Sequence, residues 1–253
     1  MLNIVVPMAG RGSRFAREGY SLPKPLIPVR GVPMIRLVIE NLRPSCQHRF
    51  IFLCLRKHLE AHAVHLKLEQ WAPGCQVIAV DAVTEGAACT VLLARELIDD
   101  ANPLMIANSD QYVEIDIDGY LEAMDSARAD GLIMTMKADD PKWSFVRFDQ
   151  AGAIVEVVEK AVVSDEATVG IYNFREGRLF VAAAQEMIDK GLRVNGEFYV
   201  APTYNQMISR GMKIIHYNVG SEMRGMYGLG IPSDLKSFES AEVSHRAVRG
   251  INE

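Results

Sequence analysis

Apolar runs of strand-like length alternate with helix-like segments through the first 137 residues, and this alternation restricts the fold more than any other feature. The strand-like runs are 2-LNIVVP-7, 50-FIFLCL-55, 76-QVIAV-80, 103-PLMIAN-108 and 131-GLIMTMK-137. Apolar residues with helical spacing lie between them, at 33–42, 57–71, 87–97 and 116–128. Because short buried strands joined by helices are typical of parallel sheets, we predict an α/β fold whose mostly parallel, mixed sheet carries helices on both faces.

The pattern changes beyond about residue 140. Residues 144–160 predict two strands joined by a turn at 150–152, and 167–174 predict another strand. The remaining expected elements are helices near 176–190 and 198–210, a strand at 213–219 and a helix near 233–247. We see no linker and no repeat, so we expect one domain over 1–253. Its parallel half, about 1–140, should bind a cofactor-like ligand, and its mixed half, about 141–240, should cap it.

Composition excludes several classes of protein. The chain has 253 residues, 49% of them hydrophobic, which is enough for a large buried core. No apolar run reaches the ~20 residues of a membrane-spanning helix, and the start lacks a signal-peptide pattern. Without a CxxC pair, the four cysteines are expected to be reduced core thiols in the cytoplasm: Cys46, Cys54, Cys75 and Cys89. We also expect neither a membrane partner nor an appended hexapeptide-repeat domain.

Positive charge is concentrated near the start of an acidic chain. The net charge is −5 at pH 7, yet residues 1–40 carry six basic and two acidic side chains. A local positive segment on an acidic protein indicates a small anionic ligand rather than a long polyanion. We therefore expect no nucleic-acid partner.

The stretch 10-GRGSR-14 follows the first predicted strand and matches neither common phosphate motif. Phe15 stands where G-x-G-x-x-G needs its third glycine and where G-x4-G-K-[ST] needs its second. A Gly-x-Gly turn remains, whose backbone N–H groups can cradle phosphate, accompanied by Arg14 and by Lys24 ten residues later. The simpler alternative is a tight turn with surface arginines. The preceding strand and the proline-flanked lysine favour the phosphate site.

The paired segments 7-PMAGRGSRF-15 and 23-PKPLIPV-29 resemble the signature of the sugar-phosphate nucleotidyltransferases, the nucleoside-diphosphate-sugar pyrophosphorylases. The resemblance runs to about residue 240. It implies a Rossmann-like, GT-A-like nucleotidyltransferase fold. It also implies that an NTP is condensed with a sugar 1-phosphate, or a similar phosphorylated small molecule, to give an NDP-linked product and pyrophosphate. A role in supplying building blocks for capsule or surface polysaccharide follows from the family alone.

The resemblance also implies residue roles. Catalytic roles fall to Arg14, Lys24 and Asp110, and Asp110 is also implied to hold Mg²⁺. The nucleotide-binding residues implied are Met8, Ala9, Gly10, Arg11, Gly12, Glu85, Gly86, Ala87 and Asn108. The acceptor-binding residues implied are Glu159, Lys160, Gly170 and Glu197. From the residues alone, Asp110 could instead form an Asx turn, Gly86 could open an ordinary helix, and Glu159–Lys160 could be a solvated strand edge.

One position departs from the family pattern. The family often has a second metal aspartate two residues before the glycine of a Gly-Thr-Pro segment, and 226-MYGLGIPSDL-235 places Gly228 there. Either one aspartate suffices together with phosphate oxygens and water, or another acid replaces the missing one. A non-sugar phosphate, such as phosphocholine or another small phosphorylated alcohol or amide, therefore stays open as the acceptor.

Two other function classes compete with the nucleotidyltransferase. A nucleotide-sugar-dependent glycosyltransferase usually carries Asp-x-Asp after the metal strand, whereas residues 108–110 are Asn-Ser-Asp. A catalytically silent nucleotide-binding regulatory subunit would not need the lysine and aspartate that are present. The sequence leaves the nucleobase open, and a homo-oligomer is compatible with it. His58, His62 and His65 are interpreted as a polar stripe on one helix face rather than a metal site, and Trp71, Trp143 and the methionines as packing residues.

Overall fold

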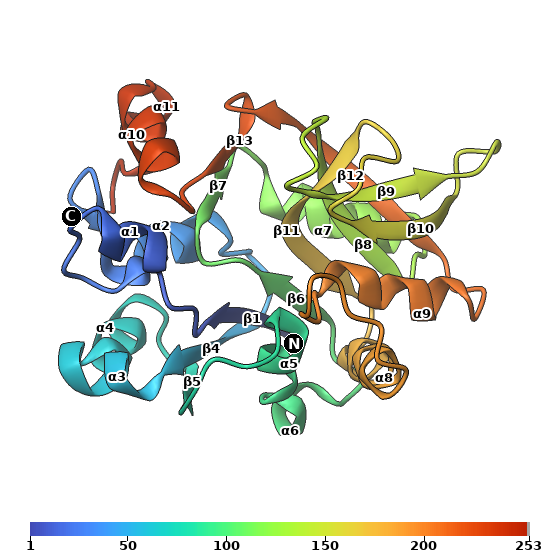
Figure 1. Ribbon diagram of the computed structural model, residues 1–253, viewed down its shortest axis with the longest axis horizontal. Coiled ribbons are helices and arrows are strands. Elements are labelled where there is room, and N and C mark those ends of the chain that lie inside the picture. Colours follow the sequence, from blue (N-terminus) through green and yellow to red (C-terminus); the bar gives the residue numbers. More distant parts are fainter. Residues whose placement is uncertain (252–253) are drawn as a thin grey trace.

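The computed structural model describes residues 1–251, and one eleven-stranded sheet runs through this part of the chain (Figure 1). The strand order is β5-β4-β1-β6-β11-β8-β12-β13-β7, with β9 joined to β11 and β10 to β9. The strands are β1 (Leu2–Met8), β4 (His48–Leu55), β5 (Gln76–Val80), β6 (Leu104–Ala107), β7 (Gln111–Val113), β8 (Gly131–Lys137), β9 (Ser144–Phe148), β10 (Ile154–Glu159), β11 (Glu166–Phe174), β12 (Ile214–Glu222) and β13 (Gly225–Gly228).

Most strands of this sheet point the same way. The four strands β5, β4, β1 and β6 are mutually parallel, and β8, β12 and β13 form a second parallel group. Strand β11 runs antiparallel between β6 and β8, so the two parallel groups share one direction. The carboxyl ends of both groups therefore lie at the same edge of the sheet, where ligands bind in folds of this type.

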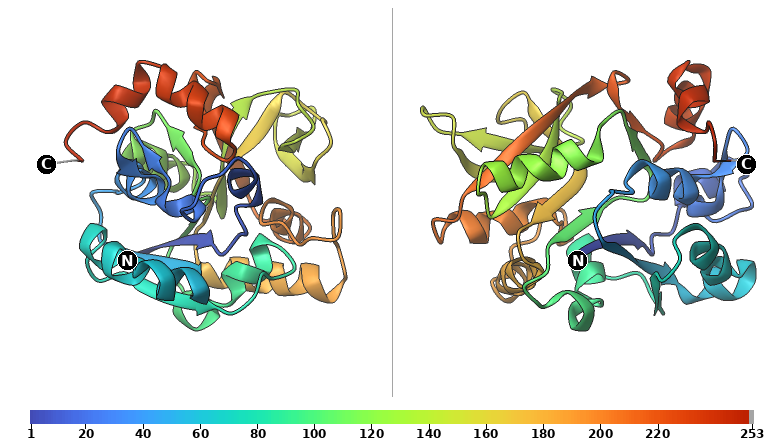
Figure 2. Two further views of the ribbon diagram at one scale, coloured as in Figure 1. Left: turned by 60° about the vertical axis from the view of Figure 1, so that its left-hand side comes forward. Right: turned by 180° about the vertical axis from the view of Figure 1, so that it is seen from behind.

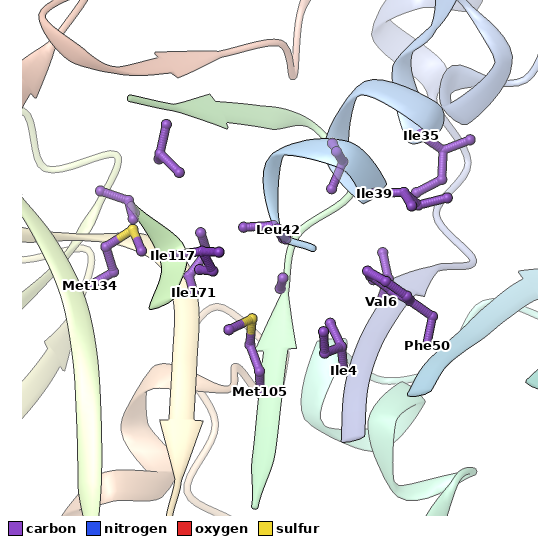
Figure 3. Close-up of a cluster of buried hydrophobic side chains, with 14 of the residues drawn as sticks. Ile4, Val6, Ile35, Ile39, Leu42, Phe50, Met105, Ile117, Met134 and Ile171 are labelled. Atoms are coloured by element: carbon purple, nitrogen blue, oxygen red, sulfur yellow. The ribbon is translucent and has the colours of Figure 1, made fainter. Parts of the chain in front are cut away.

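Helices cover both faces of the sheet because the strands are apolar on both faces. Ile4 and Val6 of β1 pack with Phe50 of β4 and with Ile35 and Ile39 of α2 (Met34–Asn41), as Figure 3 shows. On this face lie also α4 (Val64–Trp71) and α7 (Ile117–Ser126). The opposite face is covered by α5 (Ala87–Leu92), α6 (Arg95–Ile98), α8 (Gly177–Asp189) and α9 (Tyr204–Ile208). Alternate residues of β1 and of β4 thus enter different cores.

A third core fixes the N-terminal loop and the last helices together. Phe15 of α1 (Ser13–Arg17) packs in it with Leu235 and Phe238 of α10 (Pro232–Ser240). Val243 of α11 (Val243–Ala247) and the small hairpin of β2 (Pro28–Val29) and β3 (Val32–Pro33) complete it. Figure 2 shows α10 and α11 lying over this N-terminal segment, far from it in sequence.

The expected elements are present, but several long helices are divided. The helix expected over 57–71 breaks at Ala63, which has φ 48°, into α3 (Arg56–His62) and α4. The segment 87–97 divides into α5 and α6, and the last helix divides into α10 and α11. Only a 3-10 turn (Ala201–Thr203) and then α9 occupy 198–210. The short strands β2, β3, β7 and β13 were not predicted, because their few residues show no clear periodicity.

None of the helices of residues 1–251 is long and apolar enough to cross a membrane. The four cysteines are unpaired in this part of the chain, with Cys54 and Cys75 buried. Cys46 is exposed, so its expected place in the core is wrong.

Candidate active site

Two neighbouring clefts open at the carboxyl edge of the sheet. The first has a volume of about 390 Å³ and is lined by Pro7, Met8, Gly10, Gly12, Ser13, Arg14, Phe15, Lys24, Pro25, Asn108, Ser109, Asp110 and Gly230. The second has a volume of about 210 Å³ and is lined by Ala87, Asn108, Lys142, Trp143, Ser144, Glu159, Lys160, Thr168, Val169, Gly170, Tyr172, Tyr199, Val200 and Ala201. Asn108 lines both clefts, so the two are adjacent.

The glycine loop forms one wall of the first cleft. Gly12 has φ 60° and precedes α1, and a Cβ at this position would lie 3.3 Å from Cβ of Lys24. Buried Phe15 anchors α1 in the third core, which leaves Arg14 exposed at the cleft. Ala9 is buried in the core beneath the loop. The loop can therefore bring backbone N–H groups close to an anion only because Gly12 tolerates a left-handed conformation.

An ion pair crosses the first cleft. Pro23 holds an extended conformation before a 3-10 turn (Lys24–Leu26), and Lys24 Nζ donates to Oδ2 of Asp110, which follows β6. Both side chains are partly buried, 21% and 26% exposed. The ammonium thus neutralises the carboxylate, and both groups face the hollow that the glycine loop lines.

The charge and chemistry of Asp110 fit a hard divalent cation. Its carboxylate supplies the oxygen ligands that Mg²⁺ prefers, at the end of a strand and within the cleft. A Cβ at Gly230 would lie 3.0 Å from Asp110 Oδ2, so only glycine leaves this carboxylate its full space. No group of three or more metal-ligating side chains occurs within residues 1–251, so bound phosphate and water would have to complete the coordination.

The backbone at Gly170 explains why Asn108 lies between the clefts. Gly170 has φ 85°, and a Cβ there would lie 2.1 Å from Asn108 Nδ2. The N–H of Asn108 donates to the carbonyl oxygen of Gly170 at 3.0 Å. Gly170 thus gives the asparagine side chain its place, while it also lines the second cleft itself.

Charged and aromatic groups meet in the second cleft. Burial raises the pKa of Glu159 above its ordinary value, although the hydrogen bond from Ser144 and the charge of Lys160 oppose this. Lys160 has φ 58°, and its Nζ lies 5.3 Å from the ring centroid of Tyr199. Burial, aided by Glu197, raises the pKa of Tyr199 to about 12, so its hydroxyl stays protonated at neutral pH. The cleft therefore offers a cation, a carboxyl group and hydroxyl donors together.

Residues 85–87, which the resemblance implies to bind the nucleotide, do not all line a cleft. Glu85 pairs with Arg193 at 2.7 Å and its side chain is 66% exposed. Gly86 has φ 133°, and a Cβ there would lie 2.4 Å from the carbonyl oxygen of Phe198. A glycine is therefore required at position 86, because the backbone of Phe198 leaves no room for a side chain. Of residues 85–87, Ala87 lines the second cleft.

Glu197 lies outside both clefts. It is exposed and forms an isolated bridge with Val194, ahead of the 3-10 turn and α9 instead of within a helix. Glu197, which the resemblance implies to bind the acceptor, therefore precedes the helical segment and is not part of the lining of the second cleft. Its neighbour in the second cleft is Tyr199.

The cleft residues that were missed from the sequence include Trp143, Lys142 and Tyr199. Trp143, assigned to packing, lines the second cleft, and its buried Nε1 has no hydrogen-bond partner among the described residues. Lys142 Nζ lies 4.9 Å from the Trp143 ring, and Tyr199 lies opposite Lys160. The signal for Trp143 was slight: an aromatic residue beside a lysine immediately before a strand.

His58, His62 and His65 do not lie on one helix face. The break at Ala63 leaves His65 exposed on α4, while His58 and His62 of α3 line a hollow of about 180 Å³. Arg11 lines this hollow rather than the first cleft, and Gly12 and Lys24 line both. The interpretation as a single surface stripe is therefore wrong in its geometry.

Comparison with known proteins gives one family and several relatives. The sequence model of the family described as nucleotidyl transferase matches residues 4–199. The bifunctional protein GlmU of Burkholderia orbicola is 27% identical over 254 residues, which cover 98% of this chain and 53% of that protein. The GlmU of Burkholderia mallei is 28% identical over 253 residues, which cover 97% of this chain and 52% of that protein. The chain thus spans about half the length of these curated relatives.

Solved structures share the fold. A nucleoside-diphosphate-sugar pyrophosphorylase from Vibrio cholerae RC9 is 25% identical, with a TM-score of 0.77 over 94% of this chain and 100% of its own. A UDP-glucose pyrophosphorylase complexed with UDP-glucose gives 0.77 at 16% identity, over 97% of this chain and 100% of its own. The second likeness shows the fold alone. The predicted α/β class with a mixed, mostly parallel sheet is confirmed.

Proposed function

Because the chain belongs to the nucleotidyl transferase family, we propose that it condenses an NTP with a sugar 1-phosphate or a similar phosphorylated small molecule, releasing pyrophosphate. The observation that carries this proposal is the first cleft, where the glycine loop, Arg14, Lys24 and Asp110 line one hollow. Backbone N–H groups and two cations in one hollow suit a triphosphate. As an enzyme, the chain is of the nucleotidyltransferase and pyrophosphorylase type.

We assign the NTP to the first cleft and the acceptor to the second. The first is lined mainly by residues of the parallel half, about 1–140, and the second mainly by residues beyond 140. Lys160 would hold the acceptor phosphate, and Glu159 with its hydrogen-bonding neighbours would hold the rest of the acceptor. Adjacency through Asn108 supports a reaction across the boundary between the clefts.

In the proposed reaction, a phosphate oxygen of the acceptor attacks the α-phosphorus, and the bond to the pyrophosphate breaks. The nucleophile is already an anion, so no general base is needed. Catalysis would then consist of positioning and of charge neutralisation. Arg14 would stabilise the leaving pyrophosphate, and Lys24 would bridge phosphates near the reacting centre.

The ion pair of Lys24 and Asp110 would open when the substrates bind. A triphosphate would offer the ammonium of Lys24 new anionic partners and so release the carboxylate of Asp110 for a cation. Mg²⁺, when bound by Asp110, would supply charge neutralisation and orient the α-phosphate. Lys24 and Asp110 are therefore the residues on which the proposal depends most.

The decisive experiment is pyrophosphate release with Mg²⁺, crossing four NTPs with a panel of sugar 1-phosphates and small phosphorylated alcohols and amides. We expect one pair to release pyrophosphate, which would identify base and acceptor together. Lys57→Ala, an exposed lysine on α3, is the matched control for Lys24→Ala. Silence across the panel despite NTP binding in thermal shift would contradict the proposal and favour a silent subunit. Consumption of a nucleotide sugar would favour a glycosyltransferase.

A further inference from the structure

The hollow of about 180 Å³ beside α3 has basic walls, and we call it the basic hollow. It is lined by part of the glycine loop, by residues 20–24 and by two histidines of α3. Apart from the phenol of Tyr20, each ionisable side chain that lines it is basic: Arg11, Lys24, His58 and His62. No carboxylate of residues 1–251 belongs to this lining, so the hollow is a concave surface with an excess of positive charge.

The basic groups on the side of α3 have no acidic partner. Lys24 donates to Asp110 and is thereby engaged at the first cleft. None of the ion pairs within residues 1–251 includes Arg11, His58 or His62. A guanidinium and two imidazoles are therefore left to bind whatever enters the basic hollow.

The surroundings of His58 lack a hydrogen-bond acceptor and a negative charge. Its Nδ1 is buried and has no hydrogen-bond partner among the described residues. Burial lowers the pKa of His58, and the charges of Lys57 and His62 add to this effect. An anion in the basic hollow would oppose this repulsion and favour the protonated ring. The histidines of α3 thus gain most from an occupant that carries negative charge.

The size and charge of the basic hollow select a small anion. Its volume is less than half of the 390 Å³ of the first cleft, and it is below the ~300 Å³ at which sites for drug-sized ligands begin, so a nucleotide is too large for it. His58 and His62 lie one helical turn apart, a spacing that can bind a transition metal. Arg11 and Lys24 would repel a cation there, and residues 1–251 contain no group of three metal-ligating side chains.

We propose that the basic hollow binds a small inorganic anion of the phosphate class, phosphate or pyrophosphate, separately from the nucleotide in the first cleft. Arg11 donates guanidinium N–H groups to the phosphate oxygens, and His58 and His62 each donate a ring N–H. Gly12 lines both the first cleft and the basic hollow, so the glycine loop has an anion site on each side. The inference needs no turnover by the enzyme and is tested without a nucleotide.

The test is isothermal titration calorimetry with phosphate and, separately, with pyrophosphate, at an ionic strength held constant with sodium chloride. We expect Arg11→Ala to weaken phosphate binding at least about tenfold and His62→Gln at least about threefold, since each removes a charged or polar donor. Arg17→Ala on α1 and His65→Gln on α4, both exposed and outside the basic hollow, are the matched controls and should leave the affinity unchanged. Circular dichroism checks that each variant folds.

Two further measurements locate the anion. The imidazole NMR signals of His58 and His62 should shift on addition of phosphate, whereas that of His65 should not. Arg14→Ala, which removes a cation of the first cleft, should weaken phosphate binding less than Arg11→Ala does. The tighter of the two anions, if its affinity depends on Arg11, is the ligand of the basic hollow.

Three results would overturn the inference. The first is that neither anion binds saturably, and the second is that both bind with unchanged affinity in Arg11→Ala and His62→Gln. The third is a loss of phosphate binding that occurs in Arg14→Ala alone, which would place the anion in the first cleft. Pyrophosphate release by the wild type is measured separately, so each of these results leaves the proposed function standing.

Discussion

Replacing Gly170 by alanine adds one atom, Cβ, beside Asn108, the residue that lines both clefts. The new Cβ would lie 2.1 Å from Nδ2 and 2.7 Å from Cγ of Asn108, so the asparagine side chain must move. Overpacking of this kind costs about 1–3 kcal/mol. Alanine at φ 85° costs about 1–2 kcal/mol more, because Cβ crowds the backbone there. The expected loss in the free energy of unfolding is therefore about 2–5 kcal/mol.

Gly152 offers a matched control for the backbone part of this cost. It has φ 82° in the turn between β9 and β10, and a Cβ there would meet nothing within 4 Å. Gly152→Ala should therefore cost only about 1–2 kcal/mol. Urea unfolding at neutral pH measures both variants, and each kcal/mol should also lower Tm by about 2–4 °C. Equal losses for the two variants would refute the reasoning.

A double substitution tests the contact itself. Asn108→Ala removes the two nearest of the three atoms that the new Cβ would meet and leaves only Oε1 of Gln111 at 3.0 Å, so Gly170→Ala should cost less in that background by about 1–3 kcal/mol. Strict additivity would mean that Asn108 does not lie where the structure places it. The same variants should bind NTP more weakly, since Asn108 lines the first cleft.

Three further predictions concern single sites. Lys24→Ala and Asp110→Asn should each lower turnover at least ~100-fold, about 2.7 kcal/mol of barrier, and steady-state pyrophosphate release near the wild-type rate would contradict their roles. Burial would raise the pKa of Glu166, but hydrogen bonds from His216 and Lys137 outweigh it and hold the pKa below its ordinary value. Its stabilisation is complete above the ordinary value of ~4.3 and is lost as pH falls through the lower folded value, so urea unfolding at pH 7 and pH 3 should show a smaller acid loss in Glu166→Gln. Ala63→Gly should raise the free energy of unfolding by about 0.5–1 kcal/mol, because glycine tolerates φ 48°, and a lower Tm would argue against the helix break.

The sheet could be predicted because its strands carry their own signal. Continuous apolar runs such as those of β1 and β4 are buried on both faces, and their alternation with helix-like segments identified the fold class. Helix boundaries were harder, since the break between α3 and α4 depends on the conformation of Ala63, a good helix former. Strands as short as β7 and β13 are created by tertiary pairing rather than by local preference.

Part of the candidate site could be predicted from the sequence because several of its residues belong to short local motifs. Gly12, Lys24 and Asp110 stand in local motifs, and the structure brings them to one cleft. Trp143 and Tyr199 are isolated residues whose positions depend on distant packing. Arg11 lies within the glycine motif, yet its side chain lines the neighbouring hollow instead of the first cleft. The motif defines the spacing of its residues along the chain and does not define the direction in which each side chain points.

The hairpin of β9 and β10 has little strand pairing with the rest of the sheet, although Phe145 and Val146 are fully buried. It is joined to β11 through a single register pair, Ala167 with Phe145, and lies to the side of the molecule away from β4 and β5 (Figure 1). Asn205 holds it from α9 through two hydrogen bonds to Val157, at 2.7 and 2.8 Å. Glu159 ends the hairpin, and Trp143 directly precedes it. Residues of this hairpin can thus be exchanged, and with them part of the lining of the second cleft, while the ion pair of Lys24 and the glycine loop stay as they are. A chain built this way can change the lining of one cleft without rebuilding the other.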